Sequence, residues 1–232
     1  MNEDKRILSF VFYTAISLVI MTIITWIFAM KAVPPAGPYC PGDCMSYPFK
    51  DILSYYPRDY NWMYLAIFQV FIYVIFIVSN HFITQNENKL FSLLSISFAI
   101  ITATVLLIAY FVQFSVVPMS MMKGENEGIA LLTQYNGHGI FIAMEDLGYI
   151  TMSISFLFMA FIFTNKTRLE KAIRLILIFG FLLMVFSFVF YTIKYGLDRS
   201  YRFEVAAISI NWITTITIGI LVGIFIRRKL KQ

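Results

Sequence analysis

The sequence predicts an all-α protein: a polytopic transmembrane bundle of six helices, with both termini in the cytoplasm. Three observations lead to this expectation. Hydrophobic residues make up 59% of the 232 residues and charged residues only 13%, about half the charged share of a soluble domain. The apolar residues are gathered in six long runs. The basic residues flank these runs unevenly, which gives a direction to the topology.

Each of the six runs is long enough to cross a bilayer, because a hydrocarbon layer of about 30 Å requires roughly 20 apolar residues in a helix. The runs are continuous rather than alternating, which favours helices over the strands of a membrane barrel. In chain order the predicted spans are Ile7–Ala29, Asn61–Ile83, Leu90–Phe114, Ile140–Thr164, Ile173–Tyr195 and Val205–Ile226. We therefore expect a single transmembrane domain over residues 1–232.

The start of the first run resembles a secretory signal peptide, because Lys5 and Arg6 precede it. Its apolar core, however, is longer than the roughly 7–15 residues of such a peptide. We therefore expect this segment to remain in the protein as a membrane anchor.

The distribution of Lys and Arg predicts the sidedness. Eleven of the 18 basic residues lie in the segments that include the two termini, and seven lie in the alternate connections. By the positive-inside rule the termini face the cytoplasm, and the connections 30–60 and 115–139 face outward. The net charge of +5 then indicates contact with lipid headgroups of a cell membrane rather than with nucleic acid. The lipid bilayer is the expected partner, and the sequence leaves homo-oligomerisation open.

The first outer connection contains the only two cysteines, Cys40 and Cys44, around a Pro-Gly-Asp turn. On the oxidising side of a membrane, two cysteines this close favour a small loop closed by a disulfide. Free thiols are the next interpretation. A structural zinc site comes last, because it requires four ligands and the chain has only two histidines.

Polar residues recur at steps of three or four within the predicted spans, so each helix has one face suited to its neighbours. Most of these residues are expected to serve helix packing. The exception is the pair Glu145 and Asp146, which lies about one and a half turns inside the fourth span. An acidic residue at membrane depth suggests a functional site. Residues at comparable depth complete a predicted outward-facing vestibule, which consists of Glu145, Asp146, Gln113, Tyr149, Lys194 and Asn211.

Two other interpretations of the acidic pair remain open. The fourth span could begin later, so that the two carboxylates cap a helix in the headgroup region. His138 precedes Glu145 by about two helical turns, and together they could bind a divalent metal. The sequence otherwise contains no His-Glu-x-x-His, Gly-x-Ser-x-Gly, Walker or dinucleotide-binding motif. We therefore expect no cofactor, and a non-enzymatic role is favoured.

Two outer segments resemble those of an uncharacterised family of small prokaryotic six-helix integral membrane proteins. The first is Cys40–Tyr64, and the second runs from Gln113 to Pro118 and from Leu131 to Tyr149. The resemblance implies a six-helix fold in a bacterial or archaeal cell membrane, and it implies no activity. Proteins of this group often have Pro before the histidine, where this chain has Gly137, which suggests a looser turn.

Three functions are consistent with these features. The favoured hypothesis is a membrane protein whose vestibule binds a small polar molecule or a cation, for transport or for sensing. The second is a membrane enzyme that uses Glu145, Asp146 and His138 around a metal. The third is a non-catalytic scaffold or partner subunit whose aromatic outer connections form a protein interface.

Overall fold

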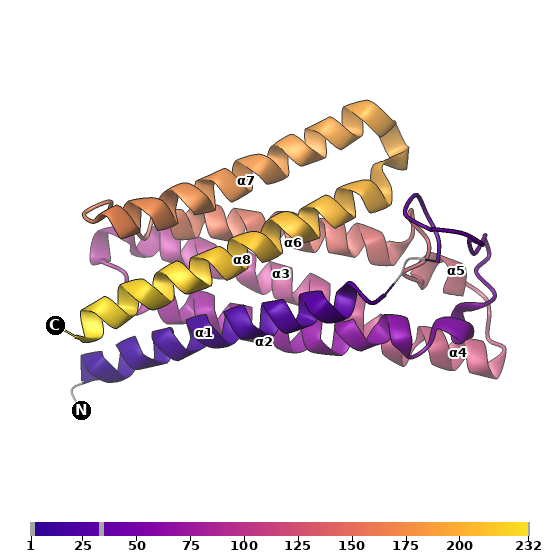
Figure 1. The fold of residues 1–232 in the computed structure, drawn as a ribbon, viewed down its shortest axis with the longest axis horizontal. Coiled ribbons are helices and arrows are strands. Elements are labelled where there is room, and N and C mark those ends of the chain that lie inside the picture. Colours follow the sequence, from indigo (N-terminus) through magenta and orange to yellow (C-terminus); the bar gives the residue numbers. More distant parts are fainter. Residues whose placement is uncertain (1–2, 33–34, 232) are drawn as a thin grey trace.

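The computed structural model describes residues 3–32 and 35–231, and this part of the chain contains helices and no strand. Six long helices lie side by side along the longest axis of the molecule (Figure 1). They are α1 (Glu3–Ala29), α2 (Asn61–His81), α3 (Lys89–Ser115), α6 (Ile140–Ala160), α7 (Arg168–Tyr195) and α8 (Ser200–Leu230). The predictions of an all-α fold and of six long helices are confirmed.

The helices have the length and apolar character of membrane spans. Five helical stretches meet this description, namely Lys5–Ala29, Arg58–His81, Asn86–Lys123, Ile140–Ala160 and Arg168–Leu230. The last stretch has 63 residues because the short helix η4 (Gly196–Arg199) joins α7 directly to α8. Figure 1 shows that α7 and α8 fold back on each other as an antiparallel pair.

Several helix boundaries lie four or five residues from the predicted ones, as at the starts of α1 and α7. Helix α6 ends at Ala160, four residues before the predicted end, because the chain turns there and Asn165 has a positive φ of 61°. Helix α8 begins at Ser200, five residues before the predicted start. Glu204 is therefore part of this helix instead of preceding it.

The two ends of the bundle differ. Both described ends of the chain lie at one end, together with the α2–α3 and α6–α7 connections (Figure 1). The opposite end, which we call the loop end, carries the α1–α2 connection with the short helices η1 (Ile52–Tyr55) and η2 (Arg58–Tyr60), and also α4 (Val117–Lys123) and α5 (Ile129–Leu132). Cys40 and Cys44 in the α1–α2 connection form the predicted disulfide, with their sulfur atoms 2.03 Å apart.

Five of the long helices form a ring, and the sixth lies outside it. Helix α1 packs on α2 and α8, α2 packs on α3, α3 packs on α6, and α6 packs on α8. Helix α7 covers α6 and α8 from outside. Phe179, Phe186 and Ile193 on α7 are more than half exposed. An apolar surface this continuous is unusual in a soluble monomer and suits contact with lipid.

The contact between α3 and α6 shows how the polar residues serve packing. The hydroxyl of Ser95 donates to the carbonyl oxygen of Ser155, and the hydroxyl of Ser155 donates to the carbonyl oxygen of Ser95. Further along, the hydroxyls of Thr102 and Thr151 lie 2.9 Å apart. All four side chains are buried. Hydrogen bonds of this kind hold helices together where water is absent.

Candidate functional site

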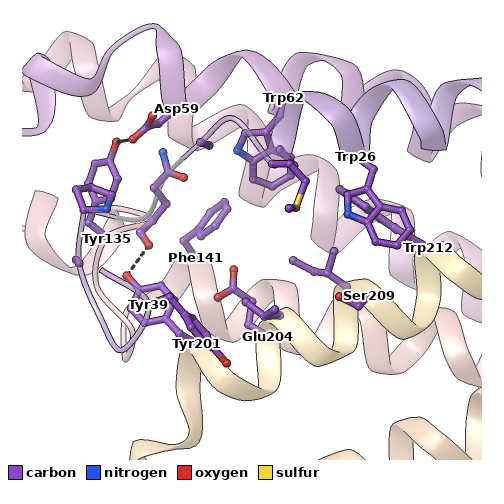
Figure 2. Close-up of a pocket in the computed structure, with 18 residues that line it drawn as sticks. Trp26, Tyr39, Asp59, Trp62, Tyr135, Phe141, Tyr201, Glu204, Ser209 and Trp212 are labelled. Carbon is purple, nitrogen blue, oxygen red and sulfur yellow. Dashed lines mark hydrogen bonds between the residues drawn. The ribbon is translucent and has the colours of Figure 1, made fainter. Parts of the chain in front are cut away.

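A cavity of about 210 Å³ opens near the loop end, between α1, α2 and α8. Phe141 at the start of α6 and residues of the α1–α2 and α5–α6 connections complete the lining (Figure 2). Met30, Tyr39 and Val205 at its edge are 74%, 46% and 45% exposed. The cavity therefore communicates with the surface.

The walls of the cavity are mainly aromatic. All three tryptophans of the chain line it, Trp26 from α1, Trp62 from α2 and Trp212 from α8. The ring of Trp212 makes edge-to-face contacts with both other rings, at centroid distances of 6.0 Å and 6.4 Å. Interlocked rings of this kind hold one another in place. The site is thus a rigid aromatic pocket whose ring faces can contact a ligand.

Two carboxylates reach the cavity, and no lysine or arginine appears among the described residues that line it. Asp59 already has partners, because Arg58 Nε lies 2.6 Å from one of its oxygens and the hydroxyl of Tyr135 donates to the other. Glu204 forms no ion pair within residues 3–32 and 35–231. Figure 2 shows Glu204 directed into the cavity toward Phe141.

Tyr135 helps to fix Asp59 in place. Burial raises the pKa of its hydroxyl, and the neighbouring Tyr60 and Asp59 raise it further. The hydroxyl therefore keeps its proton and remains a donor to Asp59. Asp59 is itself only 2% exposed, and Arg58 and Tyr135 are the partners of its two oxygens.

Tyr201, at the start of α8, lines the cavity and contacts both the α1–α2 and the α5–α6 connection. Its hydroxyl donates to the carbonyl oxygen of Gln134 at 2.9 Å, which Figure 2 shows as a dashed line. Its ring lies so close to Gly37 and Gly137 that a Cβ atom at either position would approach it within 2.3 Å and 2.9 Å, respectively. Gly137 is therefore required for space beside Tyr201.

Glu145 lies behind the cavity, in the wall between α6 and α8. Its side chain is completely buried, and neither carboxylate oxygen has a hydrogen-bond partner in the part of the chain that the structure describes. The carboxyl group of Glu204 and the hydroxyl of Tyr110 lie close to it. Two carboxyl groups from different helices thus face each other, and one of them also borders the cavity.

The six residues of the predicted vestibule do not line one space. Three of them have structural contacts instead. Gln113 holds the α5–α6 connection, because its side-chain amide donates to the carbonyl oxygen of Leu132 and accepts from the backbone N–H of Gln134. Asn211 donates to the carbonyl oxygen of Tyr149, and the hydroxyls of Tyr149 and Tyr110 lie 2.9 Å apart.

The charged residues of the predicted vestibule do not lie together in the structure. Lys194 is exposed and lies over the rings of Phe190 and Tyr195 on α7. Asp146 is half-buried and faces Arg199 in η4. None of the six predicted residues lines the cavity itself, but Glu145 lies beside Glu204 and Gln113 bonds to Gln134, and both of these partners line it.

His138 lies in the α5–α6 connection and is exposed. It borders a separate hollow near Tyr47 and Asp198. The structure does not place it beside Glu145, and the described residues include no group of three His, Cys, Asp or Glu side chains that could hold a metal ion.

Sequence reasoning missed Glu204 and the three tryptophans. Glu204 precedes the predicted sixth span by one residue, but it also precedes Asn211 by seven residues, or two helical turns. Extending the helix backwards would have placed both on the same face. The convergence of Trp26, Trp62 and Trp212 depends on how α1, α2 and α8 pack, and no local pattern reveals it.

No protein family, characterised protein or solved structure was found to match the chain. Membership of the group that the outer segments resemble therefore stays a prediction.

Proposed function

We propose that this protein is a six-span protein of the cell membrane that binds an organic cation, an amine or a quaternary ammonium compound, in the cavity at its loop end. In this proposal both termini are cytoplasmic and the loop end faces outward, so the ligand comes from outside the cell. Binding serves transport or sensing.

The observation that carries the proposal is the combination of three tryptophans with an unpaired carboxylate in one cavity. The faces of aromatic rings carry negative charge, and cages of such rings bind quaternary ammonium groups at about 0.5–2 kcal/mol for each contact. When it is deprotonated, Glu204 supplies a negative charge that no Lys or Arg of the described lining neutralises. The absence of Lys and Arg from the described lining leaves no positive charge there to attract an anionic ligand.

The location of the tryptophans provides the test. Because all three line the cavity, a bound cation changes the tryptophan emission of the purified protein in detergent. Choline is the probe, and 3,3-dimethylbutan-1-ol is the matched control, because it has the same shape without the charge. We expect saturable quenching by choline and none by the alcohol at the same concentration.

A variant pair tests the role of the carboxylate. Glu204→Gln should weaken choline binding about tenfold or more, since a hydrogen bond or contact with a charged group contributes about 1.5–3 kcal/mol. Glu127→Gln, at an exposed position in the α4–α5 connection, should bind like the unmodified protein. Equal responses to choline and the neutral alcohol, or no response to either, would disprove the proposal.

A further inference from the structure

The contact between Glu145 and Glu204 suggests how binding at the cavity is controlled. Glu145 belongs to α6 and is completely buried. Glu204 belongs to α8 and forms part of the cavity wall. Helix α6 packs on α8, both carboxyl oxygens of Glu145 lack a hydrogen-bond partner among the described residues, and Glu204 is the acidic side chain beside them. The pair therefore connects the interior of the bundle with the ligand space.

The other groups around this pair offer no neutralising charge. Tyr110 on α3 and Tyr149 on α6 lie beside Glu145, and their hydroxyls are bonded to each other. Tyr201 on α8 lies beside both acids, but its hydroxyl donates to Gln134. Asp146 adds a further negative charge near Glu204. Arg199 faces Asp146, and its guanidinium group lies against the rings of Phe188 and Phe203.

Glu145 is completely buried and Glu204 is partly buried. Two carboxylates this close cannot both be charged at low cost, because they repel each other and water does not reach the buried one. The pair is most stable when it shares one proton, as other closely spaced carboxylate pairs do. A cation in the cavity changes this balance. Its positive charge next to Glu204 stabilises a second negative charge on the pair.

We propose that the cavity exchanges a proton for its cation: Glu145 and Glu204 share one proton when the cavity is empty, and an organic cation displaces that proton into the aqueous phase. This inference rests on the proposed function, because it requires a cation at Glu204. The exchange is balanced, since one positive charge enters as one leaves. By thermodynamic linkage, protons then weaken cation binding as much as the cation weakens proton binding.

The first measurement is the pH dependence of choline affinity, followed by tryptophan emission from mildly acidic to mildly alkaline pH. Exchange of one proton makes the affinity rise about tenfold for each pH unit in the range where the pair is protonated. In weakly buffered solution with a pH indicator, choline should release about one proton for each molecule bound, and 3,3-dimethylbutan-1-ol should release none.

Variants of Glu145 separate the exchange from binding itself. Glu145→Gln leaves Glu204 in the cavity wall and removes its acidic neighbour, so it should bind choline with little pH dependence near neutrality and without proton release. Glu145→Asp retains the carboxyl group and should still release a proton. If Glu145→Gln does not fold, infrared difference spectra of the unmodified protein should still show loss of a protonated carboxyl band when choline binds.

The outcomes distinguish the two proposals. Absence of choline binding at every pH contradicts the proposed function. Binding without pH dependence and without proton release retains that function and overturns the exchange. Proton release that persists unchanged in Glu145→Gln overturns the assignment to this pair.

Discussion

The side-chain amide of Asn211 on α8 donates a hydrogen bond to the backbone carbonyl oxygen of Tyr149 on α6 at 3.0 Å. The same amide also donates to the carbonyl oxygen of Ala207 within its own helix. Asn211 is only 1% exposed. The bond therefore joins two helices of the ring, one turn along α6 from Glu145 and two turns along α8 from Glu204.

Replacing Asn211 should loosen this contact. Asn211→Leu retains the approximate volume but removes the donor, and hydrogen bonds between membrane helices contribute about 0.5–2 kcal/mol. We expect the free energy of unfolding in detergent to fall by that amount. Ser97→Ala is the control, because Ser97 is exposed and bonds only within α3. If the two variants are equally stable, the bond between α8 and α6 contributes nothing.

Gly148 permits the close approach of α6 to α3. A Cβ atom at this position would lie 2.4 Å from Cδ2 of Leu106, which is completely buried. Gly148→Ala should therefore destabilise the protein by about 1–3 kcal/mol through overpacking. Its thermal denaturation in detergent, compared with that of Gly42→Ala, tests this, because Gly42 has no atom within 4 Å of the same position.

A double variant tests whether the methyl group added by Gly148→Ala competes for space with the side chain of Leu106. Leu106→Ala leaves room for the added methyl group, so Gly148→Ala should cost less in that background than in the unmodified protein. Purely additive effects of the two substitutions would mean that the two side chains do not compete for the same space.

Gln113 connects the end of α3 to the α5–α6 connection, where it bonds both Leu132 and Gln134. Gln113→Leu removes the acceptor of the Gln134 amide, so this amide should exchange with solvent deuterium faster while the long helices retain their protection. Hydrogen exchange read by mass spectrometry tests this. Gln85→Leu, at an exposed position, should leave the exchange of Gln134 unchanged.

Membrane orientation can be tested independently of ligand binding. The proposed orientation places the C-terminus in the cytoplasm and the α4–α5 connection outside. Alkaline phosphatase fused after residue 231 should then be inactive, and the same enzyme inserted between Glu125 and Glu127 should be active. The reverse pattern would invert the topology and place the cavity on the cytoplasmic side.

The fold could be predicted closely from the sequence because membrane helices leave strong local signals. A continuous apolar run identifies a helix without reference to its neighbours, and polar residues at steps of three and four identify its packed face. Ser95, Thr102, Ser155 and Gly148 were recognisable in this way. The boundaries of α6 and α8 were less certain, because apolar residues continue past the turn after Ala160 and polar residues occupy the first turn of α8.

The candidate site was predictable only in part. Glu145 was noticeable because an acid inside an apolar run is unusual. Lys194 was misplaced because similar depth in two helices does not show whether two side chains face each other. Lys194 instead lies on the exposed side of α7, outside the ring. The rotation of each helix about its own axis comes from packing, and this rotation decides which residues share a cavity.

The position of Tyr201 between the two connections has one further consequence. Its ring contacts Gly37 from one connection and Gly137 from the other, and Glu204 follows it by three residues on the same helix. A tilt of α8 caused by a guest molecule beside Glu204 would thus move both connections together. The outer shape of the loop end would then differ between the empty and the ligand-bound protein.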